Sequence, residues 1–359
     1  MRFLLALAVI VNHTTPIFGL DLVGGQLAVK AFYIISGFYM TLILNEKYID
    51  QNNSYNLFIT NRLLRLYPIY WAILLLCVVY GVGSIFITGH FASTVNNFVQ
   101  YHKVMKADSL IFLIFTNIFL FLQDAVMFLG LDSTTGHLFF TANFRNTTPM
   151  LWTFLVVPQA WTIGLEIAFY LIAPFIVRKK ISLIMFLIAA SLALRIVMNY
   201  SGLNDDPWSY RFFPTELVFF LLGTLAYHIQ KHLSKINIPP VYYKIILSLT
   251  LAFTLFYSLL PISAVIKPWL YILFVFGSLP FVFISTKTQK FDRYIGELSY
   301  PMYLSHTFLL ACVMSLKIKP IGSLGITVTI LTVLLSIALN ELIAKRIEKL
   351  RQRRVAAIA

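Results

Sequence analysis

The chain has 359 residues, of which 59% are hydrophobic and 12% are charged. This composition excludes an ordinary soluble domain, in which about a quarter of the residues are charged, and it predicts a polytopic membrane protein. The formal net charge is +14. The basic residues cluster at the ends of apolar segments and in the C-terminal sequence KRIEKLRQRR, as the positive-inside rule produces, so we do not expect a nucleic-acid partner.

Eleven apolar segments follow one another along the chain, with no convincing internal repeat and no long polar stretch for a soluble domain. The sequence therefore predicts an all-α, polytopic transmembrane helical bundle. We expect one membrane domain at residues 1–345 and a basic cytoplasmic tail at 346–359. The apolar segments cover residues 3–20, 27–45, 66–88, 109–131, 161–177, 181–200, 212–230, 241–260, 268–286, 298–316 and 322–342.

The loops assign the two sides of the membrane. Most loop cations and the basic tail mark the cytoplasmic side, and the acidic sequence NDDPW at 204–208 marks the outer side. With both termini cytoplasmic, the number of crossings must be even. Either 109–131 is re-entrant, which gives about ten spans, or 147–160 forms a broken partner, which gives about twelve. Segment 132–160 is polar, aromatic and interrupted by Pro, so we expect it to roof a cavity.

The first apolar segment, MRFLLALAVIVNH, carries two ionisable residues on one face. Eleven helical steps separate Arg2 from His13, which corresponds to nearly whole turns and to a rise of about 16.5 Å. That is roughly half of the ~30 Å hydrocarbon thickness. Ionisable residues at membrane depth are costly and indicate function, although a lone histidine also serves as an interhelical hydrogen-bonding residue.

Two further ionisable residues reach the same depth by the helical rise. Glu166 lies about 18 Å from the cytoplasmic edge at Arg178, and His306 lies about 14 Å beyond Glu297. The sequence therefore predicts a mid-membrane cluster of two histidines and a carboxylate. The small residues Ser36 and Gly37 are predicted to permit close helix packing.

Arg62 and Arg65 are three residues apart on one helix face, level with Arg2 at the predicted cytoplasmic mouth. Taken alone they are topology determinants. Together with Arg2 they indicate capture of a phosphate-bearing ligand, since arginine binds phosphate in a bidentate manner. Histidine titrates near neutral pH and is the usual general base.

Six strings in order resemble the bacterial acyltransferase-3 family of integral membrane acyltransferases, over nearly the whole chain. The first is the Arg-x10-His pattern of the opening helix. The others are GGQLAVKAFYIISGFYMT at 24–41, FITNRLLRLYPIYW at 58–71, WTIGLEIAFYLIAPF at 161–175, FFPTELVFFLLGTLAY at 212–227 and IGELSYPMYLSHTFLL at 295–310.

The resemblance implies transfer of an acyl group, commonly acetyl, from cytoplasmic acyl-CoA to a hydroxyl of a glycan. It implies about ten spans and a bacterial inner-membrane location, with His13 as the catalytic residue. It links Arg2, Arg62 and Arg65 to activity, and we expect them to bind the CoA phosphates. We expect acetyl-CoA as co-substrate, membrane lipid around the bundle, and neither a bound cofactor nor a metal.

The other predicted site residues complete this picture. Glu166 is expected to orient or pair with a histidine, or to bind acceptor hydroxyls. His306, Trp161 and Tyr33 are expected to contact substrate. The expected acceptor is a surface polysaccharide such as lipopolysaccharide O-antigen, because the sequence is compact and lacks the SGNH-type domain of some family members. Exopolysaccharide, peptidoglycan and a small glycosylated molecule are the alternative acceptors. The acyl group moves either directly or through an acyl-His13 intermediate.

Two positions depart from the family pattern. Members usually have a few residues before the motif arginine, whereas Arg2 follows Met1 directly. Lys30 stands where a small or polar residue is expected, and we expect it to reach the interface or an anionic acceptor. The alternative function is a glycan or lipid-precursor transporter or flippase that uses the mid-membrane charges as a proton relay. A structural subunit is a weaker alternative.

Overall fold

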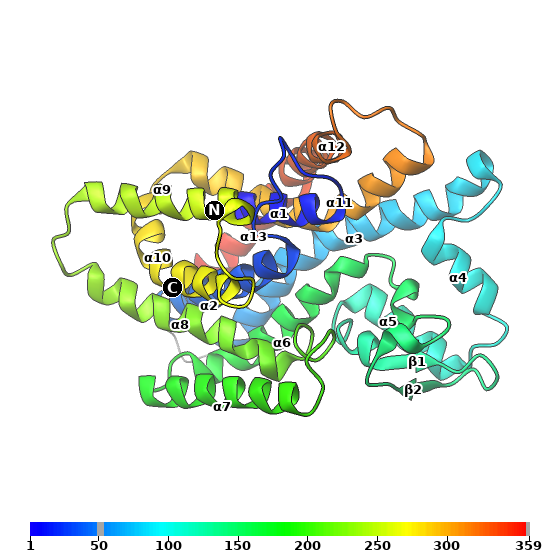
Figure 1. The fold of residues 1–359 in the computed structure, drawn as a ribbon, viewed down its shortest axis with the longest axis horizontal. Helices are drawn as coiled ribbons and strands as arrows, with labels where there is room; N and C mark the ends of the chain where they lie inside the picture. Colours follow the sequence, from blue (N-terminus) through cyan, green and yellow to red (C-terminus); the bar gives the residue numbers. More distant parts are fainter. Residues whose placement is uncertain (49–53, 357–359) are drawn as a thin grey trace.

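The computed structural model describes residues 1–48 and 54–356, and helices form most of it (Figure 1). The long helices are α1 (Arg2–His13), α2 (Gly25–Glu46), α3 (Ser54–Thr88), α4 (Ser93–Tyr101), α5 (Ala107–Phe119), α6 (Trp161–Ile176), α7 (Ile181–Tyr200), α8 (Phe213–Leu233), α9 (Pro240–Phe256), α10 (Lys267–Thr286), α11 (Lys290–Ser315), α12 (Leu324–Leu339) and α13 (Lys345–Ala356). The π-helical turn Asn340–Ala344 joins α12 to α13. Short 3-10 turns lie at Ala125–Phe128, Phe144–Asn146, Leu151–Phe154, Pro158–Ala160 and Tyr257–Leu259, and β1 (Leu129–Leu131) pairs antiparallel with β2 (Leu138–Phe140).

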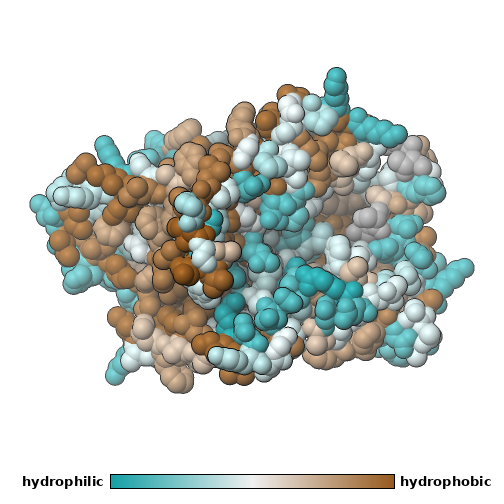
Figure 2. Space-filling model, in the orientation of Figure 1, coloured by the Kyte–Doolittle hydropathy of each residue, from teal (hydrophilic) through white to brown (hydrophobic). Residues whose placement is uncertain are grey.

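The helix bundle confirms the predicted all-α membrane architecture. Within the described residues, seven helical segments are long and apolar enough to cross a membrane. Their lengths and compositions do not establish ten crossings, which stays a prediction. Hydrophobic residues cover α8, α9 and α10 on the face shown in Figure 2, whereas hydrophilic residues gather toward its middle.

The first predicted segment ends earlier than expected, because α1 stops at His13 instead of continuing to residue 20. The backbone N–H of Thr14 bonds to Val11, and the hydroxyl of Thr14 bonds to the carbonyl of Ile10 at 2.7 Å. Pro16 then follows, and proline disfavours continued helix. The helix therefore ends at the depth of His13, which places this side chain beside irregular backbone.

The predicted segment 109–131 also stops early, because α5 ends at Phe119. Its 13 residues extend about 20 Å, which is short of the ~30 Å hydrocarbon core. The last carbonyls of α5 accept hydrogen bonds from α3: Tyr67 bonds to Phe119, Tyr70 to Asn117, and Trp71 to Ile118.

Such bonds satisfy a helix end inside the bundle, as a re-entrant segment requires. Beyond α5 the chain turns through positive φ at Leu120 and Leu122. Residues 120–160 then form the short turns and the β hairpin, which group with α4 and α5 at one end of the molecule (Figure 1). These features favour the re-entrant alternative over a broken partner helix.

Glycines allow α2 and α8 to approach each other closely. A Cβ built on Gly37 would lie 1.9 Å from the carbonyl oxygen of Phe220, and one on Gly223 would lie 2.0 Å from that of Ile34. The obstacle at both positions is backbone, so a side chain has no room. The predicted packing role is confirmed for Gly37.

Replacing Gly37 with Ala should therefore lower the free energy of unfolding by about 1–3 kcal/mol, because the added methyl group overlaps the backbone of α8. Gly277→Ala in α10 is the matched control, since a Cβ there meets nothing within 4 Å. The control should be neutral or stabilising, by up to about 1 kcal/mol. Thermal unfolding of the two purified variants tests this, and equal Tm values would contradict the packing argument.

Candidate active site

Two histidines, one from α1 and one from α11, lie next to each other. The ring centroids of His13 and His306 are 5.0 Å apart, and the ring planes are tilted by 53°. His306 is fully buried, whereas His13 at the end of α1 is exposed. The structure thus brings together the two histidines that the sequence placed at one depth.

Backbone carbonyls fix the tautomer of both histidines. Nδ1 of His13 lies 2.9 Å from the carbonyl oxygen of Val9, and Nδ1 of His306 lies 2.7 Å from that of Tyr303. A carbonyl only accepts hydrogen bonds, so each neutral ring carries its proton on Nδ1 and leaves Nε2 as the basic nitrogen. Nε2 of His306 is buried and has no hydrogen-bond partner among the described residues.

Glu166 on α6 is held by hydroxyl groups. Its Oε1 accepts hydrogen bonds from Ser36 at 2.5 Å and from Tyr170 at 2.6 Å. No hydrogen bond joins it to a histidine in the part of the chain that the structure describes. The expected role of Glu166 in orienting or pairing with a histidine therefore stays a prediction. A contact with acceptor hydroxyls stays a prediction.

The predicted arginines form a cationic cluster. Arg65 is within electrostatic range of both Arg2 and Arg62. The Arg2 guanidinium lies 5.5 Å from the ring centre of Tyr39 and passes over Gly296, where a Cβ would be 2.6 Å from it. Arg62 is 4% exposed, and its Nε has no partner among the described residues. The structure thus gathers the three arginines predicted to bind one ligand.

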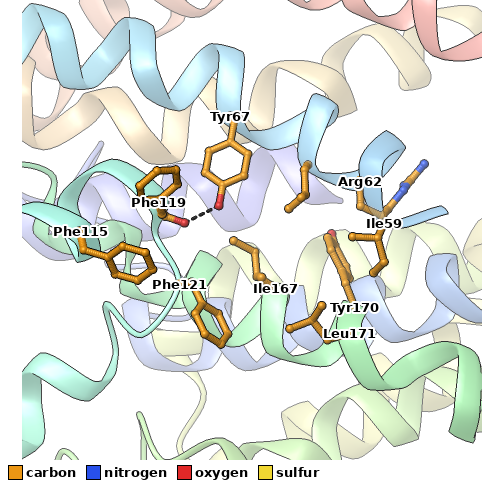
Figure 3. Close-up of a pocket in the computed structure, with 10 residues that line it drawn as sticks. Ile59, Arg62, Tyr67, Phe115, Phe119, Phe121, Ile167, Tyr170 and Leu171 are labelled. Carbon is orange, nitrogen blue, oxygen red and sulfur yellow. Dashed lines mark hydrogen bonds between the residues drawn. The ribbon is translucent and has the colours of Figure 1, made fainter. Parts of the chain in front are cut away.

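A cavity of about 260 Å³ adjoins Arg62. Aromatic and aliphatic side chains from α3, α5, the turn after α5 and α6 line it, and Arg62 and Tyr170 lie toward one end (Figure 3). Because Tyr170 also donates to Glu166, the lining of this cavity connects Arg62 with a partly buried carboxylate. This lining suits a ligand with an apolar chain, which would contact the apolar side chains, and an anionic group, which would lie near Arg62.

Tyr33 and Trp161, the two predicted substrate contacts, differ in the neighbours of their side chains. Trp161 is 4% exposed, and its ring packs against Tyr210 at 4.8 Å and under the Arg211 guanidinium at 4.2 Å. Tyr33 stacks on Phe220 at 4.5 Å, but its buried hydroxyl has no partner among the described residues. Tyr33 therefore offers an unpartnered buried hydroxyl to a ligand.

The sequence reasoning missed the charged group of Glu216. Glu216 on α8 is fully buried, and its Oε1 accepts a hydrogen bond from Arg195. Lys30 is attracted electrostatically to the same carboxylate and lies 5.4 Å from the ring centre of Phe219. Lys30 is partly buried near this carboxylate, and its expected contact with the interface or an anionic acceptor stays a prediction. The signal was the charge of Glu216 within an apolar segment.

Segment 132–160 ends against α11 beside the histidines. Gln159 donates from Nε2 to the carbonyl of Leu304 at 2.6 Å and accepts from Thr307 at 2.9 Å. Its own carbonyl accepts from the hydroxyl of Tyr303 at 2.9 Å. These bonds hold the segment directly at the level of His306. The end of the segment that was predicted to cover a cavity is therefore hydrogen-bonded to α11. The cavity itself stays a prediction.

The apolar helices define a multi-pass membrane protein. The chain belongs to the acyltransferase-3 family, because the family model described as an acyltransferase domain matches residues 1–341. No curated protein and no solved structure matches it. The family membership confirms the resemblance and makes this chain a membrane acyltransferase.

Proposed function

We propose that this enzyme transfers an acetyl group from acetyl-CoA on the cytoplasmic side to a hydroxyl of a cell-surface glycan, such as lipopolysaccharide O-antigen, in the bacterial inner membrane. The observation that carries the proposal is the fixed histidine pair. His13 presents a basic Nε2 at the exposed end of the same helix that carries Arg2 into the arginine cluster. A general base and a phosphate site are the two parts that CoA-dependent O-acylation needs.

In the proposed reaction, Arg2, Arg62 and Arg65 hold the CoA phosphates. His13 Nε2 removes the proton from the acceptor hydroxyl, and the oxygen attacks the thioester carbonyl. Collapse of the adduct breaks the C–S bond, and protonated His13 returns its proton to the leaving thiolate. In the route through an acyl-His13 intermediate, the same Nε2 attacks the thioester first and expels the CoA thiolate. The acceptor oxygen then attacks the acyl-imidazole, which breaks the C–N bond and frees His13, and the proton of the acceptor hydroxyl neutralises the thiolate. General-base help contributes about 10²–10⁴ in rate.

Tyr33 and Glu166 supply polar groups for the acceptor. The free hydroxyl of Tyr33 is available to a glycan hydroxyl, and Glu166 already accepts bonds from two hydroxyl groups. Both lie in helices that contact each other, α2 and α6. We therefore assign the acceptor to the interior between these helices and the histidine pair.

Purified protein in lipid nanodiscs should release free CoA thiol from acetyl-CoA over many turnovers only when a glycan acceptor is added. The reason is that acyl transfer consumes both substrates, whereas a transporter leaves the thioester intact. A thiol-reactive dye measures the release, and acceptor analogues blocked at their hydroxyls serve as the control. Movement of the glycan without thiol release would contradict the proposal.

A further inference from the structure

The C-terminal helix α13 lies against the arginine-bearing part of α3. Arg354 donates from Nη1 to the side-chain oxygen of Asn61 at 3.0 Å and from Nη2 to the hydroxyl of Thr60 at 2.9 Å. The continuous helical segment Leu324–Ala356 has 33 residues, or about 50 Å, and so extends beyond the ~30 Å hydrocarbon core. Its end therefore reaches the level of Arg62 and Arg65.

Arg351 turns from this helix toward the same cluster. It is 8% exposed, and it is within electrostatic range of both Arg62 and Arg65. Its Nη1 donates to Glu348 at 2.5 Å, but its Nε is buried without a partner among the described residues. The spacing of Arg351 and Arg354 repeats that of Arg62 and Arg65.

Arg351 lies near more positive than negative side chains among the described residues. Three guanidinium groups, those of Arg62, Arg65 and Arg351, repel one another, and the carboxylate that attracts Arg351 is Glu348, which is 45% exposed. Arg62 and Arg351 are buried while Arg65 is exposed, and burial of like charges is costly unless an anion compensates them. The two unpartnered Nε atoms, on Arg62 and Arg351, are donors still available to such an anion.

We propose that α13 completes a phosphate-binding site, in which Arg351 binds the ligand together with Arg62 and Arg65, and Arg354 positions the helix on α3. Guanidinium groups favour phosphate because they donate two parallel hydrogen bonds to it. The assignment of the phosphate to acyl-CoA rests on the proposed function. The other source of the same chemistry is the headgroup of an anionic lipid. This site includes residues beyond the family match, which ends at residue 341.

The test compares full-length Arg351→Gln with Arg353→Gln in phosphatidylcholine nanodiscs. Arg353 is the matched control, because it is exposed on the same helix. Titration with CoA should show a Kd raised about tenfold to a hundredfold in Arg351→Gln, the loss expected for charge-assisted hydrogen bonds, and unchanged in the control. Arg351→Lys keeps the charge, so its Kd for CoA should lie between those of the two Gln variants. This result would show that the loss in Arg351→Gln is not caused by misfolding.

A second arm uses phosphatidylglycerol and counts the lipids retained in native mass spectra. Loss of this lipid from Arg351→Gln, with CoA affinity unchanged, would assign the site to a lipid headgroup and overturn the acyl-CoA assignment. Equal behaviour of Arg351→Gln and Arg353→Gln in both arms would overturn the site itself. Wild-type protein that binds no CoA, but whose lipid retention depends on Arg351, would instead contradict the proposed function and leave the phosphate site standing.

Discussion

Replacing His13 with Ala should lower kcat for acyl transfer by about 10²–10⁴ while leaving folded protein in the membrane. The imidazole is exposed at the end of α1, so its removal opens no cavity in the core. What is lost is the basic Nε2, which the bond from Nδ1 to the Val9 carbonyl holds in the reactive tautomer. Steady-state thiol release under saturating donor measures the effect, and size-exclusion chromatography reports folding.

His306→Gln separates the roles of the two histidines. His306 is fully enclosed, so an acceptor hydroxyl reaches His13 and not His306. We expect this variant to lose less activity than His13→Gln, because it changes the neighbour of the base and not the base itself. A larger loss in His306→Gln would assign the base to α11. Full activity in His13→Ala would exclude the mechanism.

The depth of each ionisable residue could be predicted from the sequence because helical rise is nearly constant. This constancy explains why His13 and His306 meet at 5.0 Å although 293 positions separate them. Depth gives no information about which way a helix is rotated. Glu166 was placed correctly on a buried helix, yet it faces Ser36 and Tyr170 and not a histidine.

The ends of segments were less predictable than their existence. Hydropathy continued past His13, but the local signals of Thr14 and Pro16 end the helix there. In the same way, apolar residues continued beyond Phe119 although α5 ends at that point. Apolar composition is thus compatible with both helix and irregular backbone when the backbone is buried in protein.

Sequence patterns did not predict the contacts between helices that are far apart in the chain. The tail at 346–359 was predicted only as a basic cytoplasmic segment, but its residues up to 356 continue as a helix that packs on α3. The buried pair of Arg195 and Glu216 also depends on how α7 meets α8. In both cases the charges were visible in the sequence, whereas their partners required the fold.

Arg62→Gln should raise KM for acetyl-CoA about tenfold to a hundredfold with a small change in kcat. Arg62 is buried, its Nε is unpartnered, and it lies at the end of the apolar cavity beside Tyr170 (Figure 3). A charge-assisted hydrogen bond to phosphate contributes about 1.5–3 kcal/mol, which corresponds to this change in affinity. Initial rates over a range of acetyl-CoA concentrations, at fixed acceptor, measure it.

Arg62→Lys shows whether the affinity for acetyl-CoA depends on the planar shape of the guanidinium or only on its charge. Lysine keeps the charge but offers a compact ammonium in place of the planar fork, so we expect an intermediate KM. Arg65→Gln should have a smaller effect, because Arg65 is exposed and solvent screens its charge. If Arg62→Gln lowered kcat and left KM unchanged, Arg62 would act on the reacting atoms and not on the CoA phosphates. The arginines would then take part in the catalytic step. The separate roles that we propose, phosphate binding by the arginines and proton removal by His13, would be wrong.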